Sequence, residues 1–406
     1  MLSIRRALEL MVPEFPVLEA EPVPLLEAAG RVLSEDVTVG IEQPEFDHSA
    51  MDGYALRAAD VRAGVSLPVS AEVPAGAAPQ PLAAGTAVRI FTGAPLPPGA
   101  DTVIMQENAQ REGDTVRFEH VPPAGTHVRP RGSDHALGAR LLAAGALLGP
   151  SEIGLLASQG ASEVNVHRRP RVAILPTGDE LRALRAPRRP FSIVDSNTYA
   201  LAAAVQQSGC IALPLPIASD DPARIAGCVQ QGLEADVLLT VGGVSVGEYD
   251  FVSEALRAAG VDVQFHKVAI KPGKPLLFGK RGSTPVIGLP GNPVSALVVF
   301  EVFVRPGLLR MLGQVAVFPQ PIEVVLADPY PHKPGRAELV RAQLRQEAGS
   351  WTAHAHAKQG SASLASLTGQ SALVIVPRER ADIAAGEKLQ AILTGLPRRS
   401  DPAFAD

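Results

Sequence analysis

Between residues 171 and 312, compact apolar segments alternate with stretches of helical pattern, and this alternation constrains the fold more than any other feature of the chain. The apolar segments are RVAILPTG, CIALPLPIA, DVLLTVGG, VQFHKVAI and PVIGLPG. The helical stretches between and after them include SNTYALAAAVQQSG, DPARIAGCVQQGLE, DFVSEALRAAG and PVSALVVFEVFVRPGLLRML. Such β-α-β alternation predicts a mostly parallel, doubly wound sheet.

The rest of the 406 residues must fold into further units, because a prior of roughly 150 residues per domain suggests two to four domains. Short β-type runs such as TAVRIF, DTVIMQE and DTVRFEH, separated by Gly and Pro turns, predict a small β domain. A helical stretch begins near Pro150 and ends at Gly160. We predict a discontinuous N-terminal accessory domain (1–42 with 137–168), the small β domain (43–136), an α/β catalytic domain (169–316), a C-terminal β domain (317–396) and a disordered tail (397–406).

Composition excludes several classes of protein. The formal net charge of −5 argues against a general nucleic-acid binder. The only cysteines, Cys210 and Cys228, exclude a disulfide scaffold and a cysteine-based metal site, and they favour a reducing cytosol. Glu9 and Pro13 interrupt any apolar leader, and the longest apolar run, ALVVFEVFV, is shorter than a membrane span. We therefore expect a cytoplasmic protein that binds neither nucleic acid nor membrane.

Three loops that follow strands have the same chemical character, and the ends of strands are where open α/β sheets bind ligands. Glycine amides can approach a phosphate closely, and carboxylates beside an anion call for a cation such as Mg²⁺. Taken singly, each loop is equally well explained as a tight turn with helix-capping carboxylates. The loops present Thr177, Gly178, Asp179 and Glu180; Gly242, Gly243, Ser245, Gly247 and Asp250; and Gly291, Asn292, Pro293 and Ser295.

Basic residues are concentrated in two other segments. FHKVAIKPGKPLLFG carries Lys267, Lys271 and Lys274, and its Pro-Gly turn favours a defined loop that neutralises a second anion. The alternative is a set of solvated lysines on an edge strand. The segment RALRAPRRPFSIVDSN is rich in arginine and is interpreted as a mobile, solvated loop.

Acidic residues of the small β domain are ambiguous when taken alone. Asp52 and Thr92 lie in AMDGYA and RIFTGAP, where ordinary turn chemistry accounts for them. Asp134 in RGSD has Arg129 and Arg131 nearby, which also suits a surface ion pair.

Six motifs in order, FDHSAMDGYA, RIFTGAPLPPGAD, PTGDEL, GGVSVGEYD, VAIKPGKPLLFG and GLPGNPVSA, resemble those of the MoeA-type molybdopterin molybdenumtransferases, relatives of the gephyrin E domain. The resemblance implies an adenylyltransferase-like α/β domain and insertion of molybdate into adenylylated molybdopterin, with Mg²⁺-dependent release of AMP. It also implies a homodimer whose active site is shared between subunits. Transient contacts with the molybdopterin adenylyltransferase and with cofactor-delivery proteins follow from that role.

The resemblance also assigns residues. Glu180 and Asp250 are the implied metal ligands. The implied catalytic positions are Asp52, Thr92, Asp134, Glu180, Asp221, Asp250, Lys267 and Lys271. The implied or inferred substrate-binding positions are Gly242, Gly243, Ser245, Gly247, Lys274, Pro290, Gly291, Asn292, Pro293, Arg336 and Ser361.

The chain departs from the family pattern at two places. His48 stands where asparagine is more usual, and FVS follows Asp250 where a lysine commonly stands at the third place. The missing lysine removes one of the phosphate contacts that the resemblance implies, whereas Lys267 and Lys271 remain. Two other functions stay open: a non-catalytic scaffold like gephyrin, and the preceding adenylyltransferase. The acidic strand-end residues argue against a scaffold, and the additional β domains argue against an adenylyltransferase.

Overall fold

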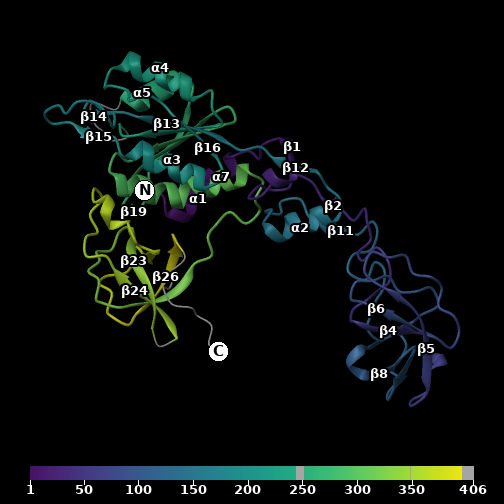
Figure 1. Ribbon diagram of the computed structural model, residues 1–406. Helices are drawn as coiled ribbons and strands as arrows, with labels where there is room; N and C mark the ends of the chain where they lie inside the picture. The colour runs from purple at the N-terminus through teal and green to yellow at the C-terminus, as the bar shows by residue number, and fades with distance from the viewer. Residues whose placement is uncertain (244–250, 348, 396–406) are drawn as a thin grey trace. The chain divides into compact units, whose positions relative to one another are not determined.

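The computed structural model describes residues 1–243, 251–347 and 349–395. It divides into two compact units (Figure 1). The first comprises Met1–Ser34, Gly145–Gly149 and Glu163–Asp406, and the second comprises Glu35–Ala144 and Pro150–Ser162. None of the helices in the described ranges is both long enough and apolar enough to cross a membrane. The boundaries of the four domains and of the tail expected from the sequence stay a prediction.

The first unit contains a six-stranded sheet in the order β16-β13-β17-β21-β20-β18. The first four strands of this order pair in parallel and the last two pair antiparallel, so the predicted doubly wound fold is confirmed. The strands are β13 (Arg171–Pro176), β16 (Ile211–Pro214), β17 (Val237–Val241), β18 (Asp262–Lys267), β20 (Pro275–Arg281) and β21 (Thr284–Leu289).

Helices cover both faces of this sheet (Figure 1). Val172 and Ile174 of β13 join the core under one group of helices, whereas Ala173 and Leu175 join the core under the other. Because both faces are buried, the strand is continuously apolar instead of alternating. One face packs against α1 (Ile4–Met11), α3 (Asn197–Gln207), α6 (Pro293–Val299), a π-helix (Phe300–Val304) and α7 (Arg305–Met311), and the other packs against α4 (Pro222–Gly232) and α5 (Phe251–Ala258).

The C-terminal part of the first unit is a small barrel. Its strands pair in the ring β23-β24-β22-β26-β25, which the pairing of β25 with β23 closes. A short strand, β19 (Ile270–Lys271), pairs in parallel with β23 and sets Lys271 opposite Glu338. The barrel strands are β22 (Ile322–Leu326), β23 (Ala337–Glu347), β24 (Ser350–Ala355), β25 (Ala372–Val376) and β26 (Lys388–Leu393).

Two smaller strand pairs complete the first unit. β1 (Ala20–Pro24) runs antiparallel to β12 (Glu163–His167). β14 (Leu181–Arg182) and β15 (Ile193–Val194) form a two-residue pair directly after β13. Short 3-10 helices cover Val12–Glu14, Leu25–Glu27 and Leu364–Ser366.

The second unit is built on a six-stranded sheet in the order β7-β4-β6-β5-β9-β8. Gly53 is required in β4, because a Cβ at this position would collide with the carbonyl oxygen of Ile104 on the neighbouring β7. The elements are β2 (Val37–Thr38), β3 (His48–Ser49), β4 (Gly53–Leu56), β5 (Ser66–Val73), β6 (Ala87–Ile90), β7 (Thr102–Met105), β8 (Ala109–Glu112), β9 (Thr115–Phe118), β10 (Val128–Arg129), β11 (Arg140–Leu142), α2 (Pro150–Ser158) and 3-10 helices at Ala58–Asp60 and Gln106–Asn108.

Candidate functional site

A cavity of about 330 Å³ lies at the carboxyl edge of the parallel strands. The three loops predicted to share this edge do so, since each contributes to the lining. Their backbones are also joined: Thr177 N–H donates to Val241 O at 3.0 Å, and Gly242 N–H donates to Leu289 O at 3.1 Å. The lining residues are Thr177, Gly178, Glu180, Asp220, Gly242, Gly243, Pro275, Pro290, Gly291 and Asn292.

Glycine is needed at the centre of this edge. Gly242 has φ +91°, a backbone conformation that side chains disfavour. A Cβ there would lie 2.8 Å from Thr177 O. The bare backbone lets the loops after β13 and β17 approach each other, and it leaves the cavity floor free of side chains.

Carboxylates line one side of the cavity. Glu180 and Asp220 both reach it. Asp220 N–H donates to Asp179 Oδ1 at 3.1 Å, and Asp179 N–H donates to Asp220 Oδ2 at 3.4 Å, so these two loops hold each other.

Asp221 caps a helix in the structure, and its predicted catalytic role stays a prediction. Its Oδ1 accepts from Arg224 N–H at 2.8 Å, which makes it the N-cap of α4. Asp220, which the sequence interpretation passed over, lines the cavity. The sequence carried a signal for the capping role, because Asp221 is followed directly by Pro222, and this is the typical pattern of an N-cap and first helical turn.

Ser245, Gly247 and Asp250 lie outside the described residues, and their predicted roles stay predictions. Among the residues that are described, no group of three or more His, Cys, Asp or Glu side chains could hold a metal ion by itself. The donors that line the cavity are nevertheless oxygens, from Thr177, Glu180, Asp220 and Asn292. Such donors fit Mg²⁺, which is commonly held by one or two carboxylates together with water and substrate phosphates.

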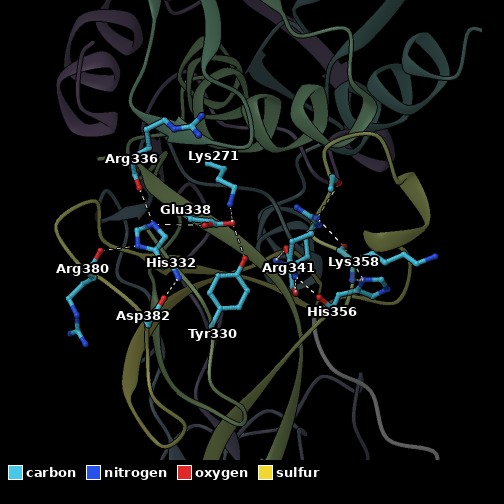
Figure 2. Close-up of polar contacts among 12 residues, drawn as sticks. Lys271, Tyr330, His332, Arg336, Glu338, Arg341, His356, Lys358, Arg380 and Asp382 are labelled. Carbon is cyan, nitrogen blue, oxygen red and sulfur yellow. Dashed lines mark hydrogen bonds and ion pairs between the residues drawn. The ribbon is translucent and has the colours of Figure 1, made fainter. Parts of the chain in front are cut away.

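A second cavity, of about 630 Å³, is basic. Lys271 Nζ lies 2.9 Å from Glu338 Oε1, and Tyr330 OH donates to the same oxygen at 2.8 Å (Figure 2). Burial raises the pKa of Tyr330, and the hydrogen bond to Glu338 raises it further. The cavity is lined by Met1, Lys271, Lys274, Pro331, His332, Lys333, Pro334, Gly335, Arg336, Glu338 and Asp382.

His332 holds the loop that presents Arg336. His332 N–H donates to Asp382 Oδ1 at 2.8 Å. The two ring nitrogens lie 3.0 Å from Arg380 O and 3.2 Å from Arg336 O, as Figure 2 shows. Arg336 therefore lies beside the basic cavity on a fixed loop.

Arg341 is a candidate that sequence interpretation missed. It is 1 % exposed, and burial lowers the pKa of its guanidinium. Its Nη2 donates to Lys358 O at 3.1 Å and Gly360 O at 3.3 Å (Figure 2), whereas its Nε is buried and has no hydrogen-bond partner among the described residues. An arginine inside the apolar run ELVRA was the available signal, since a buried charge must find partners or ligands.

The loop after β24 contacts the first turn of α6, next to the first cavity. Ser361 O accepts from Val294 N–H at 3.1 Å, and Val294 belongs to the first turn of α6, directly after the cavity residues Gly291 and Asn292. Ser361 is thereby brought to the strand edge by its backbone. Pro293 begins α6 at the same point.

The remaining predicted lysines are near these cavities. Lys267 ends β18 and stands opposite Pro275, a residue of the first cavity. Lys274 lines the basic cavity.

Asp52 and Thr92 form a defined pair in the second unit. Asp52 Oδ1 accepts from Thr92 N–H and from Thr92 Oγ1, each at 2.8 Å. The backbone hydrogen bond from Thr92 lowers the pKa of Asp52 most. The hydrogen bond from the Thr92 hydroxyl and the positive charge of Arg89 lower it further. Asp134 lies on another loop, where its N–H donates to Gln43 O at 2.9 Å.

Comparison with known proteins identifies the class to which this architecture belongs. The sheet that carries the first cavity matches a family described as a probable molybdopterin binding domain, over residues 173–310. Residues 2–160 match the MoeA N-terminal region (domain I and II), and residues 323–394 match the MoeA C-terminal region (domain IV).

The chain belongs to the MoeA family. It is 39% identical over 382 residues to a molybdopterin molybdenumtransferase of Nostoc sp., covering 91% of this chain and 87% of the relative. It is 38% identical over 383 residues to molybdopterin molybdenumtransferase 2 of Mycobacterium tuberculosis, covering 91% and 93%. The crystal structure of a molybdopterin biosynthesis MoeA protein from Pyrococcus horikoshii matches with a TM-score of 0.83 and 30% identity, over 97% of this chain and all of that one.

Proposed function

We propose that the chain is a molybdopterin molybdenumtransferase of molybdenum cofactor biosynthesis. In the proposed reaction, molybdate is inserted into adenylylated molybdopterin and AMP is released in a magnesium-dependent manner. The observation that carries the proposal is the cavity at the strand edge, where glycine backbone and carboxylate oxygens meet. The family and the enzymes to which the chain is similar support the same function.

The strand-edge cavity would bind the phosphate end of the nucleotide. The bare backbone at Gly242 and Gly243 allows close approach of an anion, and Asn292 adds an amide to the lining. Glu180 and Asp220, together with Asp250, would hold Mg²⁺. When bound, the ion would supply charge neutralisation at the phosphoanhydride.

The basic residues would receive the second anion, molybdate. Lys271 is oriented by Glu338, and Lys274 and Arg336 line the same cavity. Arg341, on the strand that carries Glu338, has a buried guanidinium N–H for which the described residues supply no hydrogen-bond partner. Positive charge held in a partly buried place stabilises oxyanions far better than freely solvated charge does.

The proposed reaction requires no protein nucleophile. Cleavage of the phosphoanhydride transfers the adenylyl phosphorus to an oxygen of molybdate or of water, the molybdopterin phosphate leaves, and the lysines would stabilise the charge that develops. Attack by water gives AMP directly. Attack by molybdate gives an adenylyl–molybdate anhydride, from which AMP leaves with the bridging oxygen as the dithiolene sulfurs bind molybdenum. The Asp52–Thr92 pair of the second unit is proposed to complete the site of a second copy in a homodimer. Asp134 is proposed to act there too.

The test is AMP release by the purified protein, followed by chromatography, with adenylylated molybdopterin, Mg²⁺ and molybdate. We expect release that depends on molybdate, and at least a tenfold loss of rate in Glu180→Gln. Glu27→Gln, an exposed carboxylate outside both cavities, is the matched control and should retain the wild-type rate. A second assay supplies ATP and molybdopterin. Consumption of these two compounds, without the release of AMP described above, would indicate the adenylyltransferase, and absence of both reactions would indicate a scaffold.

A further inference from the structure

The arginine-rich segment between residues 182 and 197 has a defined structure rather than the mobile loop expected from its sequence. β14 and β15 lie side by side beyond the end of β13 (Figure 1). The segment between them closes on itself, because Ser192 Oγ donates to Arg189 O at 2.8 Å and accepts from Arg189 N–H at 3.2 Å. The turn therefore fixes the backbone position from which the Arg189 side chain extends.

Arg189 binds the backbone on both sides of Glu180. Its Nη2 donates to Asp179 O at 3.2 Å and to Leu181 O at 2.9 Å. Ile193 N–H donates to the carbonyl between them, Glu180 O, at 2.8 Å. Three consecutive carbonyls of the cavity loop are thus held by this one turn.

The Glu180 side chain depends on this backbone for its direction. Throughout the described part of the chain, no side chain is found in a hydrogen bond or ion pair with the Glu180 carboxylate. The carboxylate instead lies over the Cα of Gly178, where a Cβ would collide with it. Its place at the cavity is consequently set by the main chain at residues 179–181.

We propose that Arg189 is a positioning residue, which fixes the Glu180 carboxylate at the strand-edge cavity through the two carbonyls that flank it. The inference rests on the proposed function in one respect, the use of Glu180 as a ligand for a divalent cation. Arg189 itself touches neither substrate nor cation. A guanidinium is suited to the task because several N–H groups extend from one plane and its charge strengthens the bonds.

The neighbouring Arg188 provides a matched control. It has the same charge, lies in the same turn and is exposed, but the described structure gives its side chain no hydrogen bond or ion pair. A general effect of positive charge near the cavity would appear equally in Arg188→Ala and Arg189→Ala. A positioning effect would appear only in Arg189→Ala and be partly restored in Arg189→Lys.

The experiment measures Mn²⁺ binding to the full-length protein with AMP present, by electron paramagnetic resonance of the free ion. We expect Arg189→Ala to raise the dissociation constant for Mn²⁺ roughly tenfold, as the loss of a residue that orients a ligand does. Arg188→Ala should change it less than about twofold. The melting temperatures of all variants should agree within about 2 °C, because the bonds lost are at the surface.

A double-variant cycle with Glu180→Gln decides whether Arg189 acts through Glu180. If it does, Glu180→Gln/Arg189→Ala binds Mn²⁺ no more weakly than Glu180→Gln alone. Additive losses, equal effects of the two alanine variants, or no Mn²⁺ binding by the wild type would overturn the inference. Failure of the proposed function has a different result: the proteins would show the expected pattern of Mn²⁺ dissociation constants, but the wild type would release no AMP.

Discussion

The ion pair between Lys271 and Glu338 gives one lysine two roles that can be separated by mutation. Lys271 is a proposed oxyanion contact, but it is also the cation 2.9 Å from the carboxylate of Glu338, which is a buried residue. Replacing Lys271 by methionine leaves this carboxylate, among the described residues, with the neutral Tyr330 hydroxyl on the same oxygen and with His332 Nε2 at 3.9 Å from the other oxygen. We therefore expect Lys271→Met to lower stability as well as anion binding.

The size of the stability effect follows from exposure. Losing one partner of a fully buried pair costs roughly 3–5 kcal/mol, whereas an exposed pair contributes about 0–1 kcal/mol. The Lys271 side chain is 47% exposed and that of Glu338 is 3% exposed, so we expect an intermediate loss of about 1–2 kcal/mol. For a unit of this size the melting temperature should fall by roughly 2–8 °C.

The assay combines thermal unfolding, followed by circular dichroism, with molybdate binding, followed by equilibrium dialysis. Lys271→Met/Glu338→Gln should recover most of the lost stability, because it removes the buried charge, but it should not recover molybdate binding. Lys274→Met is the control: Lys274 lines the same cavity and forms no ion pair in the described structure, so only binding should weaken. A Lys271→Met protein that melts within about 1 °C of the wild type, or a double variant less stable than the single one, would refute the reasoning.

Three further predictions concern the six-stranded sheet of the first unit and the residues beside it. Gly242→Ala should abolish AMP release and lower the free energy of unfolding in urea by about 1–3 kcal/mol. The reason is that the backbone at this residue has a positive φ and that the added Cβ would collide with Thr177 O. Wild-type activity of this variant would contradict the prediction. Asp236→Asn should lose about 1–2 kcal/mol near pH 7, because Arg168 binds this carboxylate at 2.6 and 2.7 Å. The pKa of Asp236 is lowered by Arg168 despite opposing burial, so its contribution is present above the ordinary aspartate pKa and should disappear as the pH falls below about 4; a difference independent of pH would be evidence against this. Burial raises the pKa of Cys210 to about 12, so this thiol should resist a thiol reagent at neutral pH in the folded protein, and rapid labelling detected by mass spectrometry would show otherwise.

The parallel sheet could be predicted because its determinants are local. Val172, Ala173, Ile174 and Leu175 are all buried, and a strand covered on both faces has to be apolar throughout. Sequence order then places the ends of parallel strands at one edge. The shared edge of the three glycine-containing loops followed from these two facts.

Features that depend on distant pairing could not be derived in this way. The partnership of Lys271 with Glu338 comes from the register of β19 on β23, and no local pattern specifies that register. Arg341 was passed over in favour of Arg336 because burial of a strand position is decided by closure of the barrel. The arginine-rich turn was interpreted as solvent-exposed chain, since bonds from Arg189 to backbone carbonyls leave no compositional trace.

The most direct measurement of the central claim is the position of AMP in crystals of the protein grown with AMP and Mg²⁺. The account predicts density for the phosphate at the edge formed by Thr177, Gly242 and Asn292, with the cation between that phosphate and Glu180. Density for AMP elsewhere in the molecule, or an empty edge at saturating AMP, would contradict it.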